Sequence, residues 1–293
     1  MKKILNKYKN GDVLVTLLED GTKIRYSKLE NPKVEFPESI DIKITDYCDM
    51  NCPYCHEKST IEGKHGKLDM KFIDTLPSGI ELAIGGGDPL SHPKLLEFLN
   101  KLRNKNIFPN ITINQHHLIT KWDKIKFLND NNLVFGIGIS ITNPTDEVID
   151  KVKQLNHPLL HVINGIITIE QFKKMYDKNL KLLILGYKSY TGRGEEYFKN
   201  NSEEIKSKFI TKDLFKELKK HFDVISFDNL ALTQIPVKDN VDEKTWKHSF
   251  MGEDGNHTMY IDLVKEEFAR TSTSKERFKI KDNIIDMFNV IKI

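Results

Sequence analysis

The feature that most constrains the fold is an alternation of short apolar segments with longer amphipathic ones. The apolar segments predict strands at residues 39–45, 80–84, 110–114, 133–141, 159–168 and 180–185. The amphipathic segments predict helices near 70–76, 93–104, 120–129, 145–155 and 169–177. Parallel neighbours need crossover connections, which are normally helical, so this α/β pattern predicts a parallel sheet.

The number of units favours one architecture. Six β/α units within residues 39–198 suit a partial (β/α)6 TIM-like barrel better than a full barrel of roughly 250 residues. Periodicity alone does not separate a closed barrel from an open doubly wound sheet. In both, the ligand site lies at the carboxyl ends of the strands.

Two flanking regions are predicted. Residues 1–38 form an N-terminal β-hairpin extension, because strand-like segments at 12–18 and 23–26 flank an Asp-Gly turn. Residues 199–293 form a small C-terminal α+β extension, with a charged helix over 199–221, a strand within 223–232 and a hairpin over 249–262 around Asp254-Gly255. The hairpin either plugs the barrel or, through Met259, Tyr260 and the 253–255 turn, covers its mouth.

Composition excludes several classes of protein. No apolar run approaches the roughly 20 residues that cross a bilayer, and the first residues lack a secretion signal. We therefore expect a cytoplasmic protein with no membrane partner. The net charge is +3 among 293 residues, which gives no specific nucleic-acid signal.

The three cysteines, Cys48, Cys52 and Cys55, all lie in the loop after the first core strand. An odd number crowded into one loop fits a disulfide framework poorly. Three incidental cysteines are one interpretation. A zinc-binding, non-enzymatic module that also uses His56 is another. The third is a cubane [4Fe-4S] cluster, whose fourth iron would stay open for a small molecule.

The spacing C-x3-C-x2-C, with Tyr54 before the last cysteine, resembles the signature of the radical S-adenosylmethionine (SAM) superfamily. The resemblance implies that Cys48, Cys52 and Cys55 hold a [4Fe-4S] cluster and that SAM chelates its open iron. It also implies reductive cleavage of SAM to a 5′-deoxyadenosyl radical that abstracts hydrogen from a substrate. An electron donor such as flavodoxin or ferredoxin is then required.

A second element supports the resemblance. The segment 83–90 ends the second strand and is similar to the family's Gly-Gly-Glu-Pro element, with Asp88 in place of glutamate. Gly86 and Gly87 would let the backbone approach a ligand, and Asp88 would accept a hydrogen bond from the methionine ammonium of SAM. The resemblance also implies further contacts to SAM from Tyr54 and, at the ends of later strands, from Asn114, Ser140, Asn164, Leu185 and Tyr187.

Other polar residues near these ends have open roles. Arg193 could hold a carboxylate or phosphate or lie in a solvated loop, and His116 and His117 could carry protons on the substrate side. All three cysteines are already used, so no auxiliary cluster with cysteine ligands can form. The substrate remains undetermined: a peptide or protein is one alternative, and a nucleoside or other small metabolite is the other.

Overall fold

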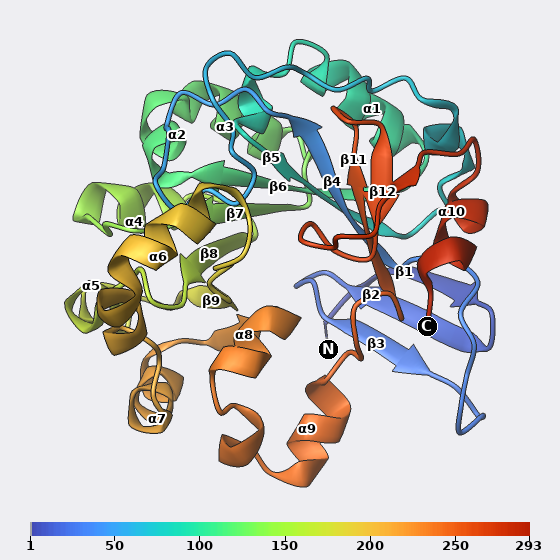
Figure 1. Cartoon of the computed structure of the whole chain (residues 1–293). Helices are drawn as coiled ribbons and strands as arrows, with labels where there is room; N and C mark the ends of the chain where they lie inside the picture. Colours follow the sequence, from blue (N-terminus) through green and yellow to red (C-terminus); the bar gives the residue numbers. More distant parts are fainter. Residues whose placement is uncertain (1) are drawn as a thin grey trace.

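The computed structural model describes residues 2–293 and is organised around one ten-stranded sheet (Figure 1). Its strands follow the order β10-β9-β8-β7-β6-β5-β4-β11-β12-β13. Neighbours from β10 to β11 are parallel, whereas β12 and β13 are antiparallel. The bounds are β4 Ser39–Thr45, β5 Glu81–Gly86, β6 Phe108–Asn114, β7 Gly136–Ser140, β8 Pro158–Ile163, β9 Lys181–Leu185, β10 Val224–Phe227, β11 Thr258–Asp262, β12 Glu267–Ala269 and β13 Phe278–Lys279.

The helices that connect these strands pack around the outside of the curved sheet (Figure 1). They are α1 Leu95–Asn104, α2 Gln115–Thr120, α3 Trp122–Asp130, α4 Asp146–Val152 and α5 Ile169–Lys173, with short 3-10 turns at Lys71–Thr75 and Pro89–Ser91. After β9 come α6 Gly192–Ser207, α7 Lys212–His221, α8 Asn229–Gln234, a 3-10 turn at Lys238–Asn240, α9 Glu243–Ser249 and, near the C-terminus, α10 Ile284–Ile291.

Strand β4 shows how the sequence divides the sheet into two faces. Ile40, Ile42 and Ile44 are buried in the main hydrophobic core with apolar residues of the surrounding helices. Side chains alternate along a strand, so Asp41 and Lys43 point to the concave face. Asp41 is exposed although β4 has a neighbour on each side, so water reaches the concave face.

The main sheet is open, with β10 and β13 at its edges, which decides the alternative that periodicity left undecided. Two parallel strands, β10 and β11, add to the six predicted ones. Two predictions for the flanking regions are corrected. The N-terminal part is a three-stranded antiparallel sheet, β1 Ile4–Asn10, β2 Val13–Leu18 and β3 Lys23–Tyr26, because a strand precedes the predicted hairpin. The predicted hairpin over 249–262 is wrong in its first half: β11 pairs with β4 and with the later β12.

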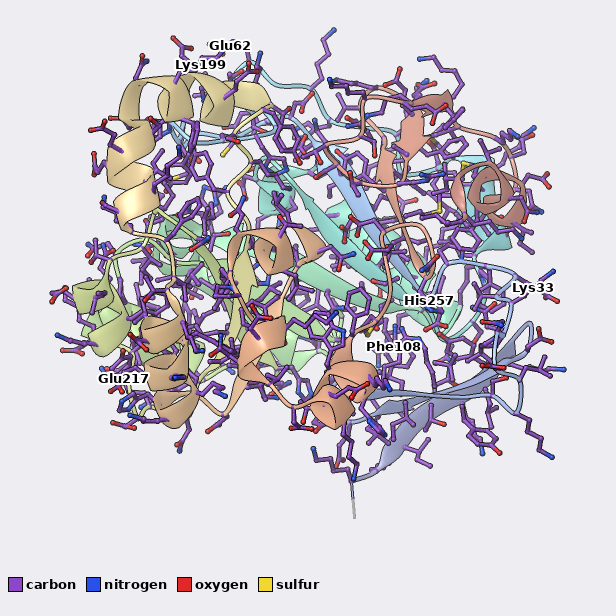
Figure 2. All side chains as sticks on the ribbon, turned by 60° about the horizontal axis from the view of Figure 1, so that its bottom comes forward. Lys33, Glu62, Phe108, Lys199, Glu217 and His257 are labelled. Carbon is purple, nitrogen blue, oxygen red and sulfur yellow. The ribbon has the colours of Figure 1, made fainter. Side chains whose placement is uncertain are left out.

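The N-terminal sheet lies at the amino ends of the core strands. Figure 2 shows it beside Phe108 and His257, which lie at the starts of β6 and β11. Lys23 pairs with Glu81 at 2.5 Å, and Arg25 pairs with the fully buried Glu38 at 2.7 Å. This end of the main sheet is therefore tied to the N-terminal sheet by ion pairs.

Within residues 2–293, no helix combines the length and the apolar character that crossing a bilayer requires.

Candidate active site

The three cysteines lie in the loop that leaves the carboxyl end of β4. All three are partly buried and none is in a disulfide. Backbone hydrogen bonds pin the loop: Cys48 N–H donates to Thr60 O at 2.8 Å, and Cys55 N–H donates to Cys52 O at 3.2 Å. These hydrogen bonds fix the loop backbone, which places the three thiols at the carboxyl ends of the parallel strands, where ligands bind in such sheets.

The thiols influence one another. Burial raises the pKa of Cys48, and the nearby Cys52 and Cys55 add to the rise. Burial and Cys55 also raise the pKa of Cys52, whereas Arg193 opposes the rise. Within residues 2–293, no three His, Cys, Asp or Glu side chains are grouped to hold a single metal ion. Three thiols that share one loop without being grouped around a single ion would suit the separate irons of an iron–sulfur cluster.

Arg193 holds this loop in place. Its Nε donates to Cys52 O at 2.9 Å, and its Nη2 donates to Ser59 O at 3.0 Å. Its own backbone N–H donates to Cys55 O at 2.9 Å. The guanidinium is directed at the cysteine loop, so Arg193 is a positioning residue for that loop.

The glycine turn after β5 packs directly on the start of the cysteine loop. A Cβ at Gly86, where φ is +113°, would lie 2.3 Å from Thr45 O, and one at Gly87 would lie 2.1 Å from Tyr47 O. Gly87 N–H and Asp88 N–H donate to those two carbonyls at 2.8 and 2.6 Å. These two glycines allow the close approach of two protein segments. Gly85 has no atom within 4 Å of a built Cβ, so it faces open space.

The Asp88 carboxylate is fully buried and already hydrogen-bonded. It accepts from Leu90 N–H at 3.2 Å, from the Ser91 hydroxyl and from the Lys121 ammonium. The contact of Asp88 with the methionine ammonium of SAM stays a prediction, and it requires an acceptor position that Lys121 and Ser91 now use.

His117 connects Asp88 to the cysteine loop. Its ring is 1 % exposed, with Nε2 at 2.7 Å from Asp49 Oδ1 and Nδ1 at 3.5 Å from Asp88 Oδ1. The hydrogen bond to His117 lowers the pKa of Asp49. His117 therefore lies against both the cysteine loop and the glycine turn from inside the protein. His116 instead donates its backbone N–H to Asn114 Oδ1 at 2.8 Å.

The other residues predicted to contact SAM differ in whether their side chains already have partners within the protein. Ser140 and Leu185 are partly exposed at the ends of β7 and β9, and Tyr54 lies edge-on to Tyr197 with ring centroids 6.3 Å apart. Asn114 caps α2 with its side chain. These four stay predictions for cofactor binding.

Asn164 and Tyr187 are engaged inside the protein. Asn164 is fully buried; its Nδ2 donates to Gln234 Oε1 at 3.2 Å and its Oδ1 accepts from Ile210 N–H at 2.9 Å. Tyr187 donates its hydroxyl to Gly194 O at 2.9 Å, and Gln234 binds its backbone N–H and C=O. Both residues hold the segments that follow β8 and β9, and a role in binding SAM stays a prediction for each.

A buried ionic group beside the cysteine loop has no counterpart among the predicted site residues. Lys43, 2 % exposed, lies 2.5 Å from Asp46, 2.7 Å from Glu57 and 3.4 Å from Asp262. Burial alone would lower the pKa of Lys43, but these carboxylates raise it well above its ordinary value. The sequence signal that could have identified this group is the charged residue Lys43 within the isoleucine-rich strand 40–44.

A second missed group faces the concave side. Lys188 donates to Ser272 Oγ at 2.9 Å and lies 3.0 Å from His56 Nε2. The side chains of Asp41 and Lys188 lie within the concave face, where loss of bulk water around them lowers the pKa of Lys188 and raises that of Asp41 to about 6, although Asp41 keeps some accessible surface. No periodic signal in the sequence marks Lys188, because it follows β9 in an irregular segment.

Comparison with known families decides the assignment. The family model described as the radical SAM superfamily matches residues 42–195, which is more than half of the chain. The chain belongs to the radical SAM superfamily. It is therefore an enzyme, and the zinc-binding, non-enzymatic alternative is set aside.

Curated relatives of this radical SAM protein include two PqqA peptide cyclases. The one from Gluconobacter oxydans is 30% identical over 81 residues, covering 26% of this chain and 23% of the relative. The one from Ruegeria pomeroyi is 28% identical over 90 residues, covering 28% and 24%. The matches span about a quarter of the curated relatives.

Solved structures of Streptococcus suis SuiB share the fold. SuiB bound to its precursor peptide SuiA gives a TM-score of 0.58 at 14% identity, covering 87% of this chain and 65% of SuiB. SuiB bound to SAM gives 0.55 at 12% identity, covering 88% and 66%. The chain thus shares with SuiB an α/β fold built on a mostly parallel sheet.

Proposed function

We propose that this radical SAM enzyme acts on a peptide, with a [4Fe-4S] cluster held by Cys48, Cys52 and Cys55. The observation that carries the proposal is the set of three half-buried thiols in one pinned loop, in a chain with no fourth cysteine. The bound cluster would supply one electron to SAM, giving methionine and a 5′-deoxyadenosyl radical that removes hydrogen from the substrate.

The protein's own residues would prepare this chemistry. Arg193 would keep the loop carbonyls turned away from the cluster, and the turn at Gly85–Gly87 would leave room for SAM at the end of β5. Strands β4 to β9 would act as the partial (β/α)6 barrel around the reaction space. We expect a reducing cytoplasm, where the thiols stay free, and a flavodoxin or ferredoxin as electron donor.

The peptide is favoured over a nucleoside or small metabolite by the related enzymes. The curated relatives are named as peptide cyclases, and one SuiB structure holds a precursor peptide.

Cleavage of SAM tests the cofactor chemistry. Protein reconstituted without oxygen and then reduced should form 5′-deoxyadenosine and methionine, measured by liquid chromatography and mass spectrometry. Cys52→Ala should abolish the product, because a lost thiolate removes the cluster or its low potential. Ser207→Ala, on the exposed end of α6, is the control and should keep wild-type turnover.

The substrate class has its own measurement. Deuterium should pass into 5′-deoxyadenosine from a deuterated peptide pool and not from deuterated nucleosides. Transfer from the nucleoside pool alone would contradict the peptide assignment while leaving the cofactor chemistry intact.

A further inference from the structure

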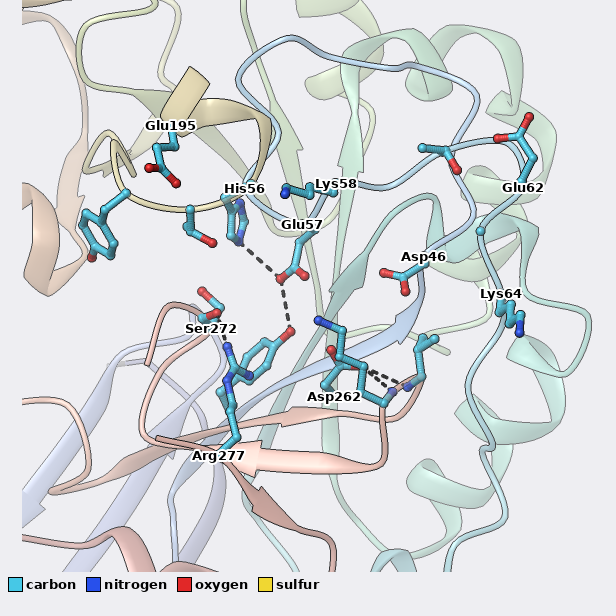
Figure 3. A pocket seen from close by; sticks show the side chains of 18 residues that line it. Asp46, His56, Glu57, Lys58, Glu62, Lys64, Glu195, Asp262, Ser272 and Arg277 are labelled. Atoms are coloured by element: carbon cyan, nitrogen blue, oxygen red, sulfur yellow. Dashed lines mark hydrogen bonds and ion pairs between the residues drawn. The ribbon is translucent and has the colours of Figure 1, made fainter. Parts of the chain in front are cut away.

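A cavity of about 650 Å³ lies between the cysteine loop, the segment after β9 and the C-terminal strands (Figure 3). Glu57 and Lys58, which follow the third cysteine closely, line one side. Tyr260 and Asp262 of β11 and Arg277 line another. The volume is large enough for several side chains of a bound segment.

Most carboxylates of this cavity already have partners within the protein. Asp46, Glu57 and Asp262 surround the buried Lys43, and Glu57 also accepts from the Tyr260 hydroxyl at 3.1 Å. Asp262 Oδ1 accepts two backbone N–H groups at 3.0 Å each. Glu195 pairs with Lys199 at 2.9 Å, which leaves Glu62 as the one lining carboxylate without an ion pair among residues 2–293.

The cations that line the cavity differ from its carboxylates, because they form no ion pairs within residues 2–293. Lys58, Lys64, Lys265 and Arg277 line it, and in the described part of the chain none has a carboxylate within 4.0 Å. The three lysines are exposed and Arg277 is partly buried. The cavity therefore offers positive groups that the fold itself does not use.

Arg277 is the most ordered of these cations. Its Nε donates to Ser274 O at 3.0 Å and its Nη2 donates to Ser272 O at 2.5 Å. The guanidinium carbon lies 5.1 Å from the centre of the Tyr260 ring, close enough for a cation–π contact. These contacts fix the plane of the guanidinium, and within residues 2–293 Nη1 has no hydrogen-bond partner. A fixed guanidinium with a free N–H edge suits a carboxylate.

We propose that this cavity binds a carboxylate-bearing segment of the substrate peptide, with Arg277 as its anchor and Lys58 as a second contact. The inference rests on the proposed function for its substrate class. Because Glu57 and Lys58 follow Cys55 closely, a segment bound here would be held next to the cysteine loop. The site would then select peptides with an acidic residue, or with a free C-terminal carboxylate, at a set distance from the reacting residue.

The test measures binding to reconstituted, cluster-loaded protein. The probe is a rhodamine-labelled peptide of alternating Glu and Gly with an amidated C-terminus, followed by fluorescence anisotropy at low salt. A Gln/Gly peptide with an amidated C-terminus is the neutral comparison. The Gln/Gly peptide with a free C-terminus tests recognition of a terminal carboxylate. The Glu peptide, the free-terminus peptide or both should bind at least about ten-fold more tightly than the neutral one.

Variants then locate the site. Arg277→Gln should weaken binding about ten-fold or more, and Arg277→Lys should weaken it less, because lysine keeps the charge and loses the fork. Arg103→Gln on α1 removes an equal charge at a guanidinium that also donates to a backbone carbonyl, and it should leave binding unchanged. The double variant Lys58→Gln/Lys265→Gln, at two exposed lysines, should weaken binding several-fold. If Arg277→Gln does not fold, this double variant tests the site instead.

Some results would overturn the site. Equal affinity for charged and neutral peptides, or equal losses in the Arg277 and Arg103 variants, would do so. Unchanged binding in the double lysine variant would do so as well. Wild-type cleavage of SAM is measured separately and needs no peptide, so failure of the proposed function and failure of this site give different results.

Discussion

The two ends of the main sheet use charged residues in opposite ways. At the amino ends, Lys23 and Arg25 each pair with one buried or partly buried carboxylate, Glu81 and Glu38. At the carboxyl ends, Lys43 is shared by three carboxylates, while within residues 2–293 the thiols form no disulfide and several cations have no carboxylate within 4.0 Å. The pairs at the amino ends tie two sheets together, and the His257 ring, 3.5 Å from Glu38, adds to the second pair. Surplus groups indicate where binding and chemistry take place.

The largest expected effect comes from removing the strands that complete this sheet. A chain ending before Trp246 loses β11, whose Met259 and Ile261 are buried, and the buried Phe288 of α10. Each buried apolar side chain stabilises by about 1.5–3 kcal/mol, and a domain's total stability is only about 5–15 kcal/mol. We expect insoluble protein, measured as the soluble fraction after expression.

A chain ending at Ile291 is the control for that deletion and should stay soluble, because Lys292 and Ile293 are exposed. Soluble, cluster-loaded protein from the shorter chain would show that the C-terminal strands are dispensable.

A smaller effect should follow from loosening the cysteine loop. Arg193→Ala removes two charged-donor hydrogen bonds to the loop, each worth roughly 1.5–3 kcal/mol. We expect the variant to fold and to retain about half or less of the roughly four irons of a cubane after gel filtration. Arg103→Ala, which loses a similar bond on α1, should retain all of its iron. Equal retention in both variants would mean that Arg193 does not position the loop.

The smallest effect is expected at the amino ends. Burial would raise the pKa of Glu38, but His257, Arg25 and Lys23 outweigh burial and hold that pKa below its usual range. A carboxylate with a lowered pKa stabilises the fold above the unfolded pKa of about 4.3, and the contribution is lost as pH falls through the folded pKa. Glu38→Gln should therefore cost about 1–3 kcal/mol at pH 7 and less in acid.

Denaturant unfolding of the Glu38→Gln variant and wild type between pH 7 and pH 4 measures this difference. Iron content at pH 7 should not change, which is the contrast with Arg193→Ala. A constant stability difference across the pH range would contradict the ionic role of Glu38.

Much of the fold was predictable because local periodicity reports burial. Strand β4 was predicted with its observed bounds, Ser39–Thr45, since its isoleucines alternate with polar residues. The pairing of β11 with β4 could not be predicted, because the two strands are far apart in sequence and no local pattern names a distant partner. The turn at Asp254-Gly255 exists, but the antiparallel partner of β11 is β12, which follows β11 in the sequence, and no strand immediately before the turn pairs with β11 within residues 2–293.

The candidate site also has features that the sequence predicts and features that it does not. Strand order predicted that the cysteine loop and the glycine turn both lie at the carboxyl ends of their strands. Gly86 and Gly87 were expected to admit a ligand, and the structure instead packs the start of the cysteine loop against them. The partners of Asp88, Arg193 and Asn164 were not predictable, because side-chain hydrogen bonds depend on segments brought together by the fold. Each of these three residues contacts protein groups.

The parallel pairing of β11 with β4 has a consequence for biosynthesis. As the chain leaves the ribosome, β4 and its cysteines emerge long before Thr258–Asp262. Until those residues arrive, β4 is an edge strand, and Lys43 lacks Asp262. Iron delivered during translation would meet a half-built loop beside an unpaired strand edge. Assembly of the proposed cluster would therefore follow release of the chain, and carriers of iron and sulfide would act on the completed sheet.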